Sequence, residues 1–369
     1  MRLRNLTSET DLLAAKNRYH MCKRNFFLRA HLLLVFTPAY FPKMSSTQEE
    51  ASHEINVKNG LLLYHHPYSY YSQKVLMSLY EKNLPFEKQF INLVKEVQYE
   101  PWFLKLNPRG QIPVLQDTGK VIPDSARIID YLEDNFSNGD TPRLIPINNP
   151  AVKEKVLHFR SILDPLPARV LTIGSFHHSE LVHFPKPPFV GPIRSLLKNG
   201  DKRIVSLLKD LAETNPDISL VLLRKVAVYE RKSSTITEKT EYLKLLDQFD
   251  EVLTEVENEL ASHTGDKENW WLCGDCFTVA DISLTILLER LSQLGYESRF
   301  WKNGKRPYLE KYYARVKQRE SYQKTIPNML FHVKMFMSTY RKHLTISIGV
   351  GICAVIILGG VYIALKPEK

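Results

Sequence analysis

The chain has few cysteines for its length. Only four of its 369 residues are cysteine, at positions 22, 273, 276 and 353. So small and uneven a set excludes the disulfide framework of small secreted domains and is typical of a reducing compartment. Cys273 and Cys276 form a CxxC pair with no second pair to complete a zinc site, which favours packing or coincidence over metal binding. We therefore expect no metal centre and a cytosol-facing protein.

Glycine is also scarce, and the composition excludes several other protein classes. The chain has 15 glycines and 21 prolines, with 44% hydrophobic and 24% charged residues. These values are far from those of collagen-like or disordered sequences. Because 369 residues exceed most single domains, we expect two modest domains with appended segments.

A nucleic-acid-binding pattern is missing as well, although the formal net charge is +10. Residues 1–43 contain eight basic and two acidic residues and so hold most of that surplus. The remainder has no run of Lys or Arg interleaved with aromatic residues and no zinc-finger spacing. We therefore expect no nucleic-acid partner.

The N-terminal extension, residues 1–58, departs from globular composition. An apolar stretch at 25–40 follows basic residues, but Arg29 interrupts it, and the uninterrupted part is too short to span a membrane. Met44 offers an alternative start that would remove the stretch. We expect the extension to be disordered or to act in targeting.

A long uncharged run lies near the other end of the sequence. Leu344 to Leu365 is 22 residues without a charge, with Arg341 and Lys342 before it and Lys366 after it. A helix of this length crosses about 30 Å of hydrocarbon. The run predicts a transmembrane tail anchor that leaves the preceding residues in the cytosol, and its short basic tail suits the mitochondrial outer membrane or the peroxisome.

The segment before this run, residues 327–343, alternates apolar side chains with Lys334, Arg341 and Lys342. This pattern predicts an amphipathic helix at the membrane surface. A linker helix that packs on the protein is the alternative.

Regular periodicity begins at Leu61. Apolar runs predict strands at 61–64, 86–93, 112–116 and 120–123, and helical spacing predicts helices at 72–82 and 126–135. The order βαβ, loop, ββα is that of a thioredoxin-like domain, which we assign to residues 59–140.

Three local motifs carry a family resemblance. They are residues 63–64 with Pro67, Ser69 and 72–75; residues 107–115, NPRGQIPVL; and Asp124-Ser125 leading into 128–132. Together they resemble the N-terminal domain of the glutathione transferases. The resemblance implies that Pro113 is a cis-proline and that the backbone of Ile112 pairs with the cysteinyl part of glutathione.

The same resemblance implies roles for two further positions. Asp124 and Ser125 would begin a helix that receives the γ-glutamyl carboxylate and offsets the ligand's ammonium group, although an ordinary helix cap is the alternative. Ser69 would donate to a glutathione thiolate as the catalytic hydroxyl. Several neighbours compete for that role, namely His65, His66, Tyr64, Tyr68, Tyr70 and Tyr71.

The second domain, residues 141–326, has a helical pattern. Thr278 and Asp281 form a capping box, which is also a signature of the all-α C-terminal domain of glutathione transferases. The departure from that family is an insertion at about 165–240 with helical periodicity at 193–213 and 218–232. We expect an added helical hairpin or long loop that packs on the second domain, obstructs the pocket for an electrophile and binds protein partners.

The whole pattern, an α+β chain with a helical insertion and a tail anchor, resembles the ganglioside-induced differentiation-associated protein 1 family over about 61–365. This resemblance implies a protein of the mitochondrial outer membrane, also found at peroxisomes, that influences organelle fission, morphology and redox balance. The alternative is a membrane-anchored enzyme that conjugates glutathione to a hydrophobic electrophile. We favour the first reading, and the sequence leaves both catalysis and homodimer formation open.

Overall fold

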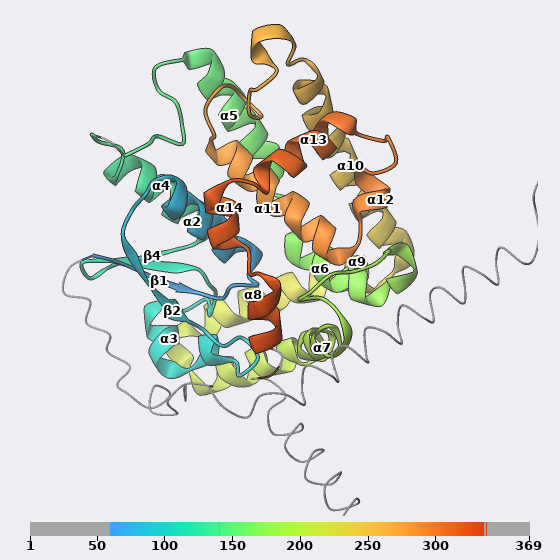
Figure 1. Ribbon diagram of the computed structural model, residues 1–369. Coiled ribbons are helices and arrows are strands. Elements are labelled where there is room, and N and C mark those ends of the chain that lie inside the picture. Colours follow the sequence, from blue (N-terminus) through green and yellow to red (C-terminus); the bar gives the residue numbers. More distant parts are fainter. Residues whose placement is uncertain (1–59, 140, 336, 338–369) are drawn as a thin grey trace, which may run out of the picture. The chain divides into compact units, whose positions relative to one another are not determined.

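A four-stranded mixed sheet forms the N-terminal part of the fold (Figure 1). Its strands are β1 (Leu61–His65), β2 (Phe86–Phe90), β3 (Val114–Asp117) and β4 (Lys120–Pro123). In the order β2-β1-β3-β4, β1 runs parallel to β2 and antiparallel to β3, and β3 and β4 form a hairpin. The computed structural model describes residues 60–139, 141–335 and 337, so the expected extension at 1–58 and tail anchor at 344–365 lie outside the described residues.

Both faces of the sheet are covered, which explains why β1 is an unbroken apolar run rather than an alternating one. Leu61, Leu63 and Leu115 point into the main core with α2 (Tyr70–Glu81) and α4 (Ser125–Asn135). On the opposite face, Leu62, Tyr64 and Val114 pack with Phe103 of α3 (Pro101–Leu106). The segment that contains α3 was expected to be a loop. The four strands and the two helices expected in this domain are confirmed, with ends shifted by a few residues.

The helical part surrounds α11 (Val279–Leu294), in which every residue is buried. The capping box at its start is confirmed: Asp281 accepts hydrogen bonds from the backbone N–H of Thr278 (2.8 Å), the backbone N–H of Leu272 (2.8 Å) and the hydroxyl of Tyr312 (2.9 Å). The remaining α-helices are α5 (Pro150–Leu163), α6 (Ala168–His177), α7 (Gly191–Thr214), α8 (Ser219–Arg231), α9 (Ser233–Thr237), α10 (Lys239–Ala261), α12 (Glu297–Phe300), α13 (Pro307–Val316) and α14 (Glu320–Thr325). Short 3-10 helices are η2 (Val97–Tyr99), η3 (Ser179–Leu181), η4 (Pro216–Ile218) and η5 (Gly265–Lys267). Among the described residues, no helix is both long and apolar enough to cross a membrane.

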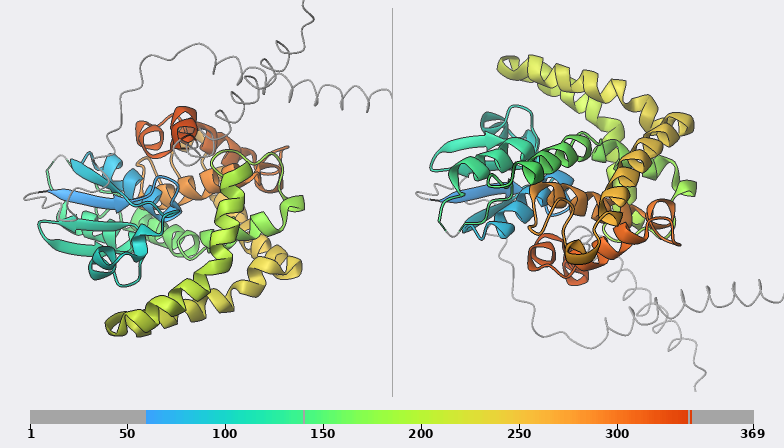
Figure 2. Two further views of the ribbon diagram at one scale, coloured as in Figure 1. Left: turned by 90° about the horizontal axis from the view of Figure 1, so that it is seen from below. Right: turned by 90° about the horizontal axis from the view of Figure 1, so that it is seen from above.

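The insertion forms a helical hairpin, α7 packed on α8, as one of the two expected alternatives (Figure 2). It packs on α6 of the second domain, as expected, and its apolar face also packs on the N-terminal domain, which was not expected. Leu208 and Ala212 of α7 and Leu222 and Val226 of α8 form one buried cluster with two residues of that domain, Tyr99 and Leu104. Tyr99 and Leu104 thus cover an apolar face of the hairpin that we expected the second domain to cover.

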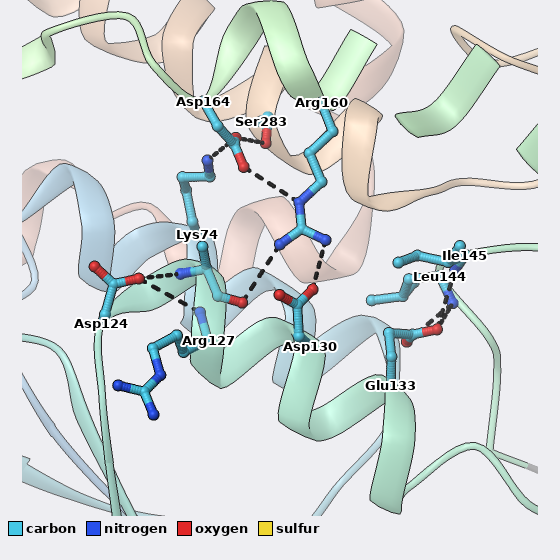
Figure 3. A network of polar contacts seen from close by, with 11 residues as sticks. Lys74, Asp124, Arg127, Asp130, Glu133, Leu144, Ile145, Arg160, Asp164 and Ser283 are labelled. Carbon is cyan, nitrogen blue, oxygen red and sulfur yellow. Dashed lines mark hydrogen bonds and ion pairs between the residues drawn. The ribbon is translucent and has the colours of Figure 1, made fainter. Parts of the chain in front are cut away.

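A polar network joins the two domains beside α4 (Figure 3). Arg160 of α5 donates to the carboxylate of Asp130 (2.6 Å) and to the carbonyl of Ala126 (3.4 Å), both on α4. Asp164 accepts from Arg160 (3.3 Å), from Ser283 of α11 (2.7 Å) and from Lys74 of α2. Burial alone would raise the pKa of Asp164, but the ammonium of Lys74 and these other donors hold it below its ordinary value. The network fixes α4, and with it the start of that helix, against the helical domain.

Candidate functional site

Three loop segments meet at one edge of the sheet. Tyr64, near the end of β1, lies opposite Val114 at the start of β3, and Val114 lies opposite Pro123 at the end of β4. The segments that follow β1, precede β3 and follow β4 therefore share an edge. These segments hold all five residues predicted as a site from the sequence: Ser69, Ile112, Pro113, Asp124 and Ser125.

Ser69 is the N-cap of α2. Its hydroxyl oxygen accepts a hydrogen bond from the backbone N–H of Ser72 at 3.3 Å. The turn before it is tied by the backbone N–H of Ser69 to the carbonyl of His66 (2.9 Å) and by the side chain of Gln73 to the carbonyl of Pro67 (2.8 Å). The cap bond uses a lone pair of the Ser69 hydroxyl and leaves its proton free to donate to a ligand. The catalytic role of Ser69 stays a prediction.

The peptide bond between Ile112 and Pro113 is cis, as expected from the sequence. Pro113 is buried and Ile112 is half-buried. The turn ahead of them is held by Asn107, whose side chain donates to the carbonyl of Gln111 at 2.7 Å and whose carbonyl accepts from the N–H of Gly110 at 2.8 Å. The backbone of Ile112 thus follows an ordered turn, which suits it to pair with an extended peptide ligand.

Asp124 is the N-cap of α4, the structural alternative that the sequence left open. Its carboxylate accepts from the backbone N–H groups of Ala126 (3.0 Å) and Arg127 (3.4 Å), as Figure 3 shows. An incoming carboxylate would compete with Asp124 for these donors, so the exposed carboxylate of Asp124 suits an ammonium group better. Ser125 is buried beside it and keeps its predicted role toward the ligand's carboxylate. Neither ligand role is tested by these contacts.

The neighbouring aromatic residues differ in what they can offer. Burial raises the pKa of Tyr68 to about 12, and it also raises the pKa values of Tyr64 and Tyr71. These phenols can donate a hydrogen bond but are poor anions. Burial lowers the pKa of His65 to about 4, and the nearby ammonium of Lys88 adds to the effect. Burial lowers the pKa of His66 to about 3, with a smaller contribution from His65. Both imidazoles are neutral at pH 7 and supply no charge to a thiolate.

Arg290 is a site residue that the sequence analysis missed. It is buried on α11 and donates to the carbonyl of Tyr68 (2.8 Å) and to the hydroxyl of Thr172 on α6 (3.0 Å). Burial lowers its pKa to about 10, which leaves it charged at pH 7. A charged residue within the apolar run that follows the capping box was the available signal. Arg290 anchors the turn that carries Ser69 to the helical domain.

The segment before the expected tail anchor reaches the same turn. Residues 329–335 are helical, and the ring of His332 stacks on Tyr68 with a 2.9 Å contact between His332 Nδ1 and the Tyr68 hydroxyl. Phe331 meets the same ring edge-on at 6.0 Å. Met329, Leu330 and Val333 remain exposed. Part of this segment therefore packs on the protein, as a linker helix would, while an apolar side of it faces outward, as the amphipathic alternative requires.

Comparisons with known proteins agree with this layout. Residues 63–141 match the family model of the glutathione S-transferase N-terminal domain, and residues 227–315 match that of the C-terminal domain. Ganglioside-induced differentiation-associated protein 1-like 1 of Homo sapiens is 32% identical over 275 residues, which cover 73% of this chain and 74% of the relative.

Two solved structures share the fold. The beta-etherase LigF of Sphingobium sp. strain SYK-6 has a TM-score of 0.54 and 22% identity, over 72% of this chain and 98% of that chain. Ure2p in complex with glutathione has a TM-score of 0.50 and 15% identity, over 73% of this chain and 99% of that chain. At these identities, the likeness concerns the fold alone.

Proposed function

Because this chain belongs to the ganglioside-induced differentiation-associated protein 1 family of glutathione S-transferase-like proteins, we propose that it is a glutathione-responsive regulator of organelle shape. In this proposal it is anchored in the mitochondrial outer membrane by residues 344–365, faces the cytosol and also resides at peroxisomes. It influences fission, morphology and redox balance, and its transferase fold serves as a ligand-sensing module.

The contact between Tyr68 and His332 is the observation that carries this proposal. Tyr68 belongs to the turn that presents Ser69, and His332 lies 12 residues before the expected span begins. A ligand that moves the turn must therefore move or strain the segment that leads to the membrane. If ligand binding shifts the conformational equilibrium of that segment by some factor, the shifted segment changes ligand affinity by the same factor, because the coupling is reciprocal. A membrane-bound sensor requires a contact of this kind to couple its ligand to the segment.

Glutathione is the ligand that the sheet edge suits best. The backbone of Ile112 can pair with an extended peptide, Asp124 suits an ammonium group, and Ser125 suits a carboxylate. The neighbour Ure2p was solved with glutathione bound, which supports the same ligand class here. Homodimer formation, common among proteins with this fold, belongs to the proposal as well.

Calorimetry of glutathione binding by the full chain in nanodiscs tests the ligand. We expect binding in the micromolar to low-millimolar range that is lost in Asp124→Ala and Ser125→Ala. Asp134→Ala is the matched control, because Asp134 is an exposed carboxylate on the same helix. No binding by the folded wild-type protein, or an equal loss in the control variant, would refute the proposed site.

Imaging of mitochondrial networks tests the regulatory role. Overproduction of the wild-type chain should alter network fragmentation, and Asp124→Ala should lose the response while keeping its location. An identical response from both proteins would show that the effect on organelle shape does not depend on the ligand site, which would refute the sensing role.

Conjugation of glutathione is the second candidate, and the free proton of the Ser69 hydroxyl is the observation that favours it. The assay is turnover of an aromatic electrophile by wild type and Ser69→Ala. Turnover that falls with Ser69→Ala while glutathione affinity is kept would make the protein an enzyme. Equal or absent turnover in both proteins would refute catalysis through Ser69 and would leave the regulatory role as the proposed function.

A further inference from the structure

Lys225 is a buried lysine whose partners all belong to the other domain. It lies on α8 of the inserted hairpin and is 9% exposed. Its ammonium donates to the hydroxyl of Tyr99 (2.9 Å), to the carbonyl of Arg109 (2.8 Å) and to the carbonyl of Gly110 (3.3 Å). It also lies 4.8 Å from the centre of the Tyr99 ring, within the range of a cation–π contact. Three acceptors match the three donors of a protonated lysine.

The segment that Lys225 holds is the turn directly before Ile112 and Pro113. Gly110 has a positive φ of 53°, and a Cβ added there would lie 2.6 Å from carbon atoms of the Tyr99 ring. The turn therefore lies flat against Tyr99, a packing that only glycine allows. Lys225 binds the Tyr99 hydroxyl and two carbonyls of the turn. The ring and the lysine together therefore clamp the turn.

The hairpin is itself fixed at its other end. Arg169 of α6 pairs with Asp201 of α7 and stacks on the ring of Tyr229 of α8 at 3.9 Å. The hairpin therefore connects α6 of the helical domain to the turn at 107–110. The hairpin buries apolar surface against Tyr99 and Leu104, and Lys225 provides the polar contact with that turn.

We propose that Lys225 is a positioning residue that holds the turn at 107–110, and through it the backbone of Ile112, in the geometry that receives the ligand. Docking of the hairpin then sets ligand affinity, because a turn that is ordered beforehand spares the ligand the cost of ordering it. The ligand half of this inference rests on the proposed function, whereas the clamp itself does not.

Hydrogen–deuterium exchange on the full chain in nanodiscs tests the clamp without any ligand. Lys225→Met keeps the length of the side chain and removes its donors. We expect amides at 107–112 and in α8 to exchange at least about tenfold faster, since removing the donors of Lys225 leaves the buried carbonyls of the turn without their partner. Amides of α11 should be unchanged. Lys209→Met is the matched control, because Lys209 is an exposed lysine on the same hairpin.

Two further variants keep the clamp falsifiable if Lys225→Met does not fold. Tyr99→Phe removes one acceptor and keeps the ring, and should give a smaller increase at the same amides. Lys225→Arg keeps a charged donor and should restore protection, which a purely space-filling role would not predict. Unchanged exchange at 107–112 in Lys225→Met, or the same increase across α11, would overturn the clamp.

Glutathione calorimetry on the same variants tests the consequence for the ligand. If the wild type binds, Lys225→Met should weaken binding about tenfold and Lys209→Met should not. Faster exchange with unchanged affinity would overturn the positioning role. If the wild type does not bind, the proposed function fails, and the exchange experiment alone decides whether Lys225 clamps the turn.

Discussion

Hairpin docking should strengthen as the pH rises, because docking buries Lys225. Burial, with a smaller contribution from Arg169, lowers the pKa of Lys225 to about 7 from the ordinary value of 10.5. Tyr99 of the N-terminal domain accepts a hydrogen bond from Lys225, and Tyr229 lies four residues further along α8. Burial raises the pKa values of both tyrosines, so they stay neutral in this range. Lys225 is therefore the group whose titration should govern docking between pH 7 and 10.5.

The sign follows from proton linkage. The undocked lysine binds a proton up to about pH 10.5, whereas the docked lysine releases it above about pH 7. Docking therefore releases a proton, and its free energy becomes more favourable by up to about 1.4 kcal/mol per pH unit within that window. Below pH 7 the cost of burying the charge is present in full, and above pH 10.5 it vanishes. From pH 7.5 to 8.5, the opening equilibrium of the hairpin should fall about eightfold.

Exchange protection factors in α8, measured at pH 6.5, 7.5 and 8.5, provide the assay. A protection factor divides out the intrinsic pH dependence of exchange. The wild-type factors should rise between pH 7.5 and 8.5, whereas those of Lys225→Met should stay level. The same pH profile in both proteins would refute the assignment to Lys225. Factors that fall with pH in the wild type alone would refute the sign.

Three other expectations concern stability and location. Asp281→Ala leaves four buried donors without an acceptor and should lower the free energy of unfolding by about 3 kcal/mol or more, measured by urea denaturation. The exposed Asp275→Ala, which serves as the control, should change it by less than about 0.5 kcal/mol; equal losses would contradict the burial argument. Lys82→Met strands the buried carboxylate of Glu133, now 2.7 Å from the ammonium, and should cost about 3–5 kcal/mol in the same assay; a loss below about 1 kcal/mol would show that the pair is replaceable. Deletion of residues 345–369 should release the chain to the cytosol in fractionated cells, and persistence on mitochondria would exclude the tail anchor.

Local patterns predicted most of the fold. The strand at 61–65 and the helices at 70–81 and 125–135 follow from apolar periodicity, which is a property of neighbouring residues. The capping box at Thr278 was recognisable because its two side chains are three positions apart. The helix α3 escaped notice because six residues are too few for a helical period to stand out, although Pro101 at its first turn was a usable start signal.

Contacts between distant positions were beyond such patterns. Lys225 is 126 positions from Tyr99, and Arg290 is 222 positions from Tyr68. Each reads in the sequence as one charged residue on an amphipathic or apolar helix. Only the packing of the two domains reveals that both side chains hold loops of the candidate site. The cis-proline and the start of α4 were accessible because their motifs are local, whereas the residues that hold them in place come from elsewhere in the chain.

The location of the hairpin changes the grounds for preferring a regulator to an enzyme. A hairpin on the second domain would argue against catalysis by obstructing the electrophile pocket, and the hairpin contacts both α6 of that domain and, through its apolar face, Tyr99 and Leu104. Obstruction of the pocket stays a prediction, and a second reason joins it. Lys225 holds the turn before Ile112 from one side, and His332 contacts the turn before Ser69 through Tyr68. A single ligand at this edge would touch both turns. It would therefore couple the hairpin, the proposed surface for partners, to the segment that precedes the proposed tail anchor.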